Sequence, residues 1–222
     1  MGVNIGNKTL KDAYIGNKPI KKIYLGNKLL WQRLPYDAEI EYLESSGSGT
    51  QRINIPNVIP TDYDNTFETK ITFLGYTTTT QWIFWFTAFI NDNSNTYRII
   101  RNSNTNNSVL VYNGTKGANG GSSISVAIGT TYDIKIYPTY ALFNNTRVNL
   151  GTLRGNPNTG YLKLFNSNVK LRFYNFKYTK GDNVVLDMIP VRVGQVGYMY
   201  DKVSGQLFGN SGTGNFILGN DI

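Results

Sequence analysis

The chain has 222 residues, no cysteine, no histidine and a formal net charge of +8. The lack of these two residue types excludes disulfide bonds, Ser-His and Cys-His nucleophile pairs, and the commonest zinc ligands. Charged residues make up only 16% of the chain, aromatic residues make up 14%, and long helical patterns are missing. This composition predicts an all-β fold with polar loops.

The positive charge is concentrated at the N-terminal end. Residues 1–33 hold seven basic side chains and one acidic side chain, a net charge of +6, whereas the remaining residues carry only +2. The lysines alternate with Ile, Leu and Tyr, as on a solvated strand face, while proteins that bind duplexes generally cluster arginine. We therefore expect no nucleic-acid partner.

The first thirty residues repeat with a period of ten around the tripeptide Gly-Asn-Lys, which occupies residues 6–8, 16–18 and 26–28. Gly-Asn between strand-like runs is a hairpin signal, so three or four short antiparallel strands are predicted. A meander of this size buries little apolar surface by itself. It is a sheet extension packed on its own domain, an anchor and oligomerisation segment, or a segment that orders on docking. The predicted anchor residues are Ile5, Leu10, Tyr14, Ile15, Ile20, Tyr24, Leu25, Leu30 and Trp31.

The run RLPYDAEIEY marks a boundary near Pro35, which divides the chain into a repeat of residues 1–35 and a domain of residues 36–222. In that domain short strand-like runs alternate with turn-rich stretches such as SSGSG and NGTKGANGGSS. Strands at this spacing, without helices between them, predict a two-sheet antiparallel sandwich. The expected strands are residues 38–44, 51–55, 66–74, 81–90, 96–101, 108–112, 123–128, 131–137, 140–144, 146–150, 161–166, 169–178, 183–189 and 214–218.

Two long segments of the second domain carry a resemblance to a known family. They are EYLESSGSGTQRINI and LRFYNFKYTKGDNVVLDMIPVRVGQVGYMYDKVSGQLFGNSGTGNFILG. They resemble the concanavalin-like, laminin-G-type jelly-roll domains of gut bacteriophages and of surface proteins of gut bacteria. The opening differs from the family by an extra Ser48-Gly49 and by Arg52 and Asn54. The resemblance implies a two-sheet antiparallel jelly roll.

The N-terminal run IYLGNKLLW is similar to N-terminal segments of phage virion proteins, in which such strands precede a variable outer domain. Together the two resemblances imply a homo-oligomeric component of the virion surface, with three copies as the favoured number. Its partners would be other virion proteins, bound through the repeat, and host or mucosal glycans. The alternative is a carbohydrate-binding domain on a bacterial cell surface.

The sequence EIEYLE offers a catalytic alternative. Glu39, Glu41 and Glu44 resemble the Glu-x-Asp-x-x-Glu signature of retaining β-glucanases, which use the same fold and need two carboxyl groups about 5 Å apart. However, the central acid is Glu rather than Asp, and the motif lies on the first strand of the domain. We expect an ordinary opening strand and a protein that is not an enzyme.

Candidate ligand residues lie in the polar loops 91–107 and 113–123 and beside them. Asparagine, aspartate and arginine side chains suit the many hydroxyls of sugars, and the predicted ligand residues are Asn91, Asp92, Asn93, Arg98, Arg101 and Asn113. The run QWIFWF is apolar on both faces and predicts a core strand rather than a sugar-stacking platform. No metal site or cofactor is expected, because the cluster Asp62, Asp64 and Asn65 is too short to ligate calcium by itself.

The run MYDKVSGQLFGNSGTG is interpreted as the turn that closes the last hairpin. In this interpretation Asp201 caps the turn and Gly205 adopts a positive φ. The longest apolar run, WIFWF with its flanks, has the length of a strand, so no membrane-spanning segment is expected.

Overall fold

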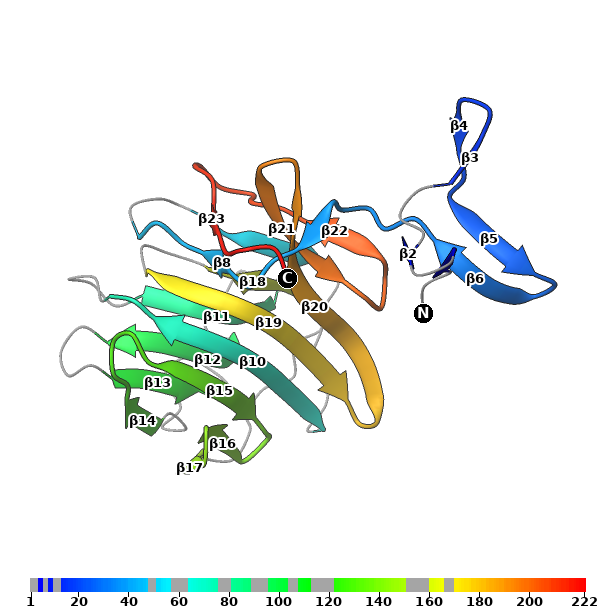
Figure 1. Ribbon diagram of the computed structural model, residues 1–222. Coiled ribbons are helices and arrows are strands. Elements are labelled where there is room, and N and C mark those ends of the chain that lie inside the picture. Colours follow the sequence, from blue (N-terminus) through cyan, green and yellow to red (C-terminus); the bar gives the residue numbers. More distant parts are fainter. Residues whose placement is uncertain are drawn as a thin grey trace. The chain divides into compact units, whose positions relative to one another are not determined.

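The computed structural model describes residues 4–5, 8–9, 13–47, 51–56, 64–75, 81–88, 96–103, 108–112, 122–150, 160–165 and 170–222. Every regular secondary-structure element in these residues is a strand, and every pairing between strands is antiparallel. The prediction of an all-β fold is therefore confirmed. The described part contains no helix long and apolar enough to cross a membrane. The chain divides into two compact units, residues 1–37 and residues 38–222, called here the hairpin unit and the sandwich unit (Figure 1).

In its described residues the hairpin unit consists of separate two-stranded sheets, and Gly16-Asn17 and Gly26-Asn27 form the described bends. In chain order the pairs are β1 (Asn4–Ile5) with β2 (Lys8–Thr9), β3 (Tyr14–Ile15) with β4 (Lys18–Pro19), and β5 (Lys22–Leu25) with β6 (Lys28–Gln32). The ten-residue repeat in the sequence is thus a repeat of hairpins.

The larger sheet of the sandwich unit has the strand order β17-β16-β15-β10-β19-β20-β21-β22. Off this path β7 pairs with β20, and β8 pairs with both β19 and β23. The bounds are β7 (Ala38–Glu39), β8 (Leu43–Glu44), β10 (Asn65–Phe73), β15 (Thr131–Ile136), β16 (Tyr140–Phe143), β17 (Thr146–Asn149), β19 (Leu171–Lys180), β20 (Asn183–Val193), β21 (Val196–Asp201), β22 (Gln206–Phe208) and β23 (Ile217–Leu218).

The smaller sheet has the order β14-β13-β12-β11-β18-β9. Its strands are β9 (Ile53–Pro56), β11 (Gln81–Ala88), β12 (Thr96–Ser103), β13 (Ser108–Tyr112), β14 (Ser122–Ser125) and β18 (Gly160–Leu164). In β9 the side chains of Ile53 and Ile55 are buried, while those of Asn54 and Pro56 are exposed. This alternation with period two is what a strand with one face on a core requires.

The two sheets enclose one hydrophobic core. Phe67 and Ile71 from β10 belong to the same buried cluster as Val109 from β13 and Leu162 from β18. Tyr178, the largest described side chain that is less than 2% exposed, stacks on Phe67 with ring centroids 4.9 Å apart. Its hydroxyl donates a hydrogen bond to Asn65 Oδ1 at 2.8 Å. An antiparallel sandwich is therefore observed, whereas the jelly-roll type implied by the resemblance stays a prediction.

The expected strand 38–44 is two strands in the structure. β7 pairs with β20, whereas β8 pairs with β19, so the strand to which this segment is hydrogen-bonded changes between Ile40 and Leu43. The run MYDKVSGQLFGNSGTG, residues 199–214, contains the predicted turn, but the strands that this turn joins, β21 and β22, were not among the expected strands. β21 also pairs with β20, which gives a further hairpin. Asp201 caps the turn between β21 and β22, and Gly205 has φ +72°, as predicted.

The last residues of the chain are fixed beside β7. Arg192 of β20 donates hydrogen bonds from Nε to Asp221 Oδ1 at 2.7 Å and from Nη2 to Asp221 Oδ2 at 2.5 Å. The backbone N–H of Ile222 donates to the carbonyl of Glu39 at 3.1 Å. Arg192 holds the pKa of Asp221 below the ordinary value of 3.8, because it hydrogen-bonds the ionised carboxylate.

Acidification should release this contact. Since the pKa of Asp221 is depressed in the folded state, the stabilisation is present above the unfolded pKa and is lost as the pH falls through the folded pKa. An NMR titration of the Asp221 carboxyl should give a lower midpoint in the wild type than in Arg192→Gln. Equal midpoints would show that the ion pair does not form in solution.

Candidate functional site: the exposed tips of the hairpin repeat

The two hairpin bends whose backbone is described have the same geometry. Gly16 has φ +59° and Gly26 has φ +58°, whereas Asn17 and Asn27, which follow them, do not have positive φ. A positive φ at the first central residue alone is typical of the type II′ turn, which favours glycine there. A Cβ on either glycine would meet no atom within 4 Å, so backbone conformation and not space requires glycine at these positions.

The strand register places an aliphatic residue opposite a lysine at every bend. Ile5 pairs with Lys8, Ile15 with Lys18, and Leu25 with Lys28. Directly opposite residues in an antiparallel pair project from the same face with their Cβ atoms about 5 Å apart. We call each set of aliphatic residue, Gly, Asn and lysine a tip: residues 5–8, 15–18 and 25–28.

The two tips whose side chains are described, residues 15–18 and 25–28, are exposed. Ile15 is 75% and Leu25 71% exposed, and the tyrosines that precede them, Tyr14 and Tyr24, are 55% and 53% exposed. Single apolar residues on a surface need no explanation, but apolar groups that gather on it mark interaction sites. Here the exposed apolar side chains recur at equivalent positions ten residues apart, next to exposed lysines.

The base of the hairpins is covered. Trp31 is only 5% exposed and lies opposite Ile23, which is half-buried like Ile20 and Leu30. A register shift leaves Leu30 without a directly opposed residue, because Ile23 pairs with Trp31 and Tyr24 pairs with Leu29.

The predicted anchor residues therefore divide into two groups. Tyr14, Ile15, Tyr24 and Leu25 are exposed at the tips, while Ile20, Leu30 and Trp31 are covered. Leu10 and the side chain of Ile5 lie outside the described residues. The exposed group is the surface that a partner can contact.

No protein-family model and no curated protein matches this chain. Its function is therefore inferred from the arrangement of its own residues.

The glutamates of EIEYLE have different surroundings in the structure. Glu44 is buried, and both of its carboxylate oxygens face cations, with Arg172 Nε 2.7 Å from Oε2 and Lys170 Nζ 3.7 Å from Oε1. Glu41 is exposed and accepts a hydrogen bond from the Asn220 side chain at 3.3 Å, while Glu39 is half-buried. Glu44 therefore forms a structural ion pair with Arg172, which links β8 to β19.

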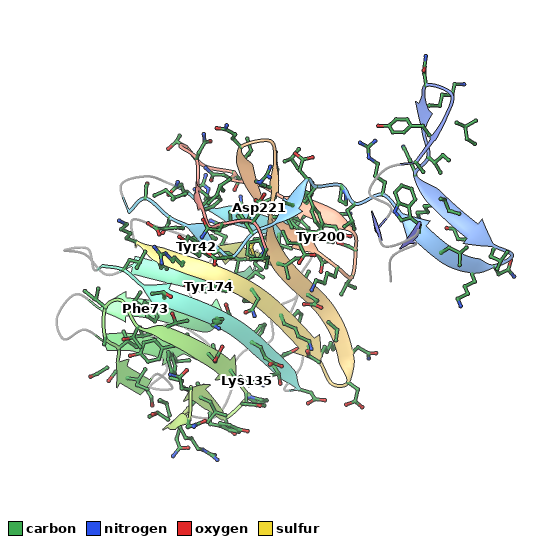
Figure 2. The ribbon with its side chains drawn as sticks, in the orientation of Figure 1. Tyr42, Phe73, Lys135, Tyr174, Tyr200 and Asp221 are labelled. Atoms are coloured by element: carbon green, nitrogen blue, oxygen red, sulfur yellow. The ribbon has the colours of Figure 1, made fainter. Side chains whose placement is uncertain are left out.

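The surroundings of this ion pair are aromatic. The Arg172 guanidinium lies 4.3 Å from the centroid of the Tyr42 ring, and Tyr42 meets Tyr174 edge to face at 5.6 Å. Figure 2 shows both tyrosines near one another beside β19. The hydrogen bond from Arg172 to Glu44 raises the pKa of the guanidinium, so this group stays charged at any pH at which the protein is folded.

The predicted ligand residues cannot be assembled into a site. Asn91, Asp92, Asn93 and Asn113 lie outside the described residues. Arg98 and Arg101 belong to β12, where the backbone of Arg101 pairs with Trp82 on one side and Leu110 on the other. The run QWIFWF forms β11, an interior strand of the smaller sheet between β12 and β18. The glycan site stays a prediction.

Asp64 and Asn65 do not act together in the described part of the chain. The side chain of Asn65 is buried and accepts a hydrogen bond from the Tyr178 hydroxyl, whereas Asp64 is exposed. Among the residues described, no group of three or more Asp or Glu is placed to hold a metal ion.

Proposed function

We propose that the protein is a non-enzymatic structural component of a bacteriophage particle. The hairpin unit attaches the chain to other proteins of the particle, and the sandwich unit is displayed at the particle surface for adhesion to host or mucosal glycans. The attachment is supported chiefly by one observation: Tyr14, Ile15, Tyr24 and Leu25 are all more than half exposed, on hairpins that form separate two-stranded sheets.

The phage assignment is supported by the resemblance of the repeat to N-terminal segments of phage virion proteins. Residues 171–219 add a resemblance to jelly-roll domains that occur both in gut bacteriophages and in surface proteins of gut bacteria. The display of the sandwich unit is supported by its self-contained core, whose members all lie at or beyond Ile40. A unit with its own core needs no cover from the hairpins in order to fold. The two functions are therefore assigned to separate units.

Self-association is part of the proposal, with three copies as the favoured number. Each strand of the sheets β3–β4 and β5–β6 has a neighbour on one side only. An unpaired strand edge is a template for pairing with another chain. Sedimentation equilibrium of the full chain gives the copy number directly, and a monomer at micromolar concentration would contradict this part.

The attachment is tested with purified particles of the phage that encodes the chain, prepared without this protein. The full chain should sediment with the particles, whereas residues 38–222 should stay in the supernatant. Circular dichroism and thermal unfolding of the truncated protein verify that its sandwich is intact. If both proteins bind particles equally, or if neither binds, the attachment proposal is wrong; binding of glycans without binding of particles would favour a bacterial surface protein.

A further inference from the structure

The two tips whose side chains are described, residues 15–18 and 25–28, closely match each other in exposure and backbone conformation. Ile15 and Leu25 differ by only four percentage points in exposure, and the glycines after them differ by one degree in φ. The aliphatic-to-lysine pairing at the bend is the same in all three hairpins. Equivalent groups in tandem make equivalent contacts, so the partner must offer the same kind of site more than once.

The chemistry of a tip defines the site that would receive it. The transfer of an exposed aliphatic side chain from water into an apolar depression lowers the free energy. The ammonium group beside it requires a negative group at the rim of that depression. The net charge of +6 on residues 1–33 extends this requirement to the whole partner surface, which must be acidic.

A protein surface fits these groups better than a nucleic acid. Phosphate backbones attract lysine and arginine, but they offer no apolar depression to Ile15 or Leu25. Another copy of this chain fits poorly as the acidic partner, since residues 34–222 also carry a net positive charge, of +2. The complementary surface therefore belongs to a different protein.

We infer that the tips 15–18 and 25–28 are repeated, equivalent binding modules, each of which places one aliphatic side chain in an apolar depression and one lysine against a carboxylate on an acidic protein of the particle. This inference rests on the proposed attachment and specifies its chemistry. Because the modules are linked in one chain, the binding of one raises the effective concentration of the next.

The aliphatic residues are tested one tip at a time in the full chain. Threonine is favoured in strands and carries a hydroxyl, so Ile15→Thr and Leu25→Thr should leave the hairpins formed and weaken the apolar contact. Each change should reduce the affinity for particles lacking the protein about five- to tenfold, and the double variant should lose roughly the product of the two. Ile128→Thr is the matched control, because Ile128 is a 51% exposed isoleucine of the sandwich unit.

The lysines are tested by salt. Wild-type binding should weaken as the salt concentration rises, and Lys18→Gln with Lys28→Gln should weaken binding at low salt and flatten this dependence. Lys202→Gln, at an exposed lysine of the sandwich unit, is the control.

Each outcome of these measurements supports or overturns the inference. Wild-type binding that the tip variants leave unchanged, or a double variant no weaker than either single variant, overturns it while the attachment stands. Duplex DNA that binds the full chain as tightly as particles do, with no effect of Ile15→Thr, overturns it in favour of a nucleic-acid partner. Failure of the wild type to bind particles removes the attachment and this inference together.

Discussion

Replacement of Phe165 by alanine should lower the free energy of unfolding of the sandwich unit by about 3–5 kcal/mol. Phe165 is only 2% exposed and follows β18 in the smaller sheet. Its ring lies 4.6 Å from that of Phe173 on β19 and 4.6 Å from that of Phe216 near the C-terminus. Truncation would leave a cavity among the end of β18, β19 and the C-terminal segment around Phe216.

The backbone of Phe165 makes a sharper prediction possible. Its φ of +58° is in the left-handed region, which costs a residue with a Cβ about 1–2 kcal/mol and costs glycine almost nothing. Glycine and alanine leave nearly the same cavity here. Phe165→Gly should therefore be about 1 kcal/mol more stable than Phe165→Ala, although glycine is usually the less stable of the two.

Urea denaturation followed by tryptophan fluorescence measures both variants, and their difference is read from the midpoints at equal slope. Phe165→Leu, which keeps most of the volume, should be the least affected of the three. A glycine variant that is no more stable than the alanine variant would mean that residue 165 does not hold its left-handed conformation in solution.

Replacement of Asp201 by alanine should cost about 2–4 kcal/mol. Its carboxylate is 1% exposed and accepts hydrogen bonds from the backbone N–H groups of Asp187, Val203 and Ser204 at 2.9, 3.2 and 2.9 Å. It also accepts a hydrogen bond from the Ser204 hydroxyl at 2.6 Å. Alanine would leave these donors without their acceptor, and the β21–β22 turn would lose its link to β20.

Two further variants isolate the role of Asp201. Asp201→Asn keeps one acceptor oxygen and should lose about half as much stability. Asp182→Ala, at an exposed aspartate in the β19–β20 turn, should change stability by less than about 0.5 kcal/mol. If all three variants unfolded at the same denaturant concentration, the buried carboxylate would not be holding the turn.

Features set by local sequence could be predicted. The alternating run 108–112 is a strand with the predicted bounds, and the Gly-Asn pairs close hairpins as predicted. β21 was missed because glycine is depleted in strands. The structure requires a small residue at position 197, because a Cβ there would collide with the side chains of Leu43 and Leu218, which come from distant parts of the chain. Such a tertiary reason is not visible in the sequence around Gly197.

The candidate site shows the same division between local and long-range causes. The repeat predicted which apolar residues could matter, but not which of them remain exposed. That distinction depends on pairing register, and the irregularity at Leu30 follows from no local signal. The left-handed Phe165 was equally unpredictable, because bulky residues rarely adopt a positive φ.

The position of the last residues has a mechanical consequence. Ile40 N–H donates to the carbonyl of Pro190, and Glu41 N–H donates to the carbonyl of Asn220, so the segment that opens the sandwich unit is bonded on both sides. A pulling force that arrives through the hairpin unit enters at Ala38 and is shared between β20 and residues 220–222. The C-terminal residues therefore reinforce the point at which such a force enters, and removal of the last three residues should lower the force that unfolds the sandwich unit.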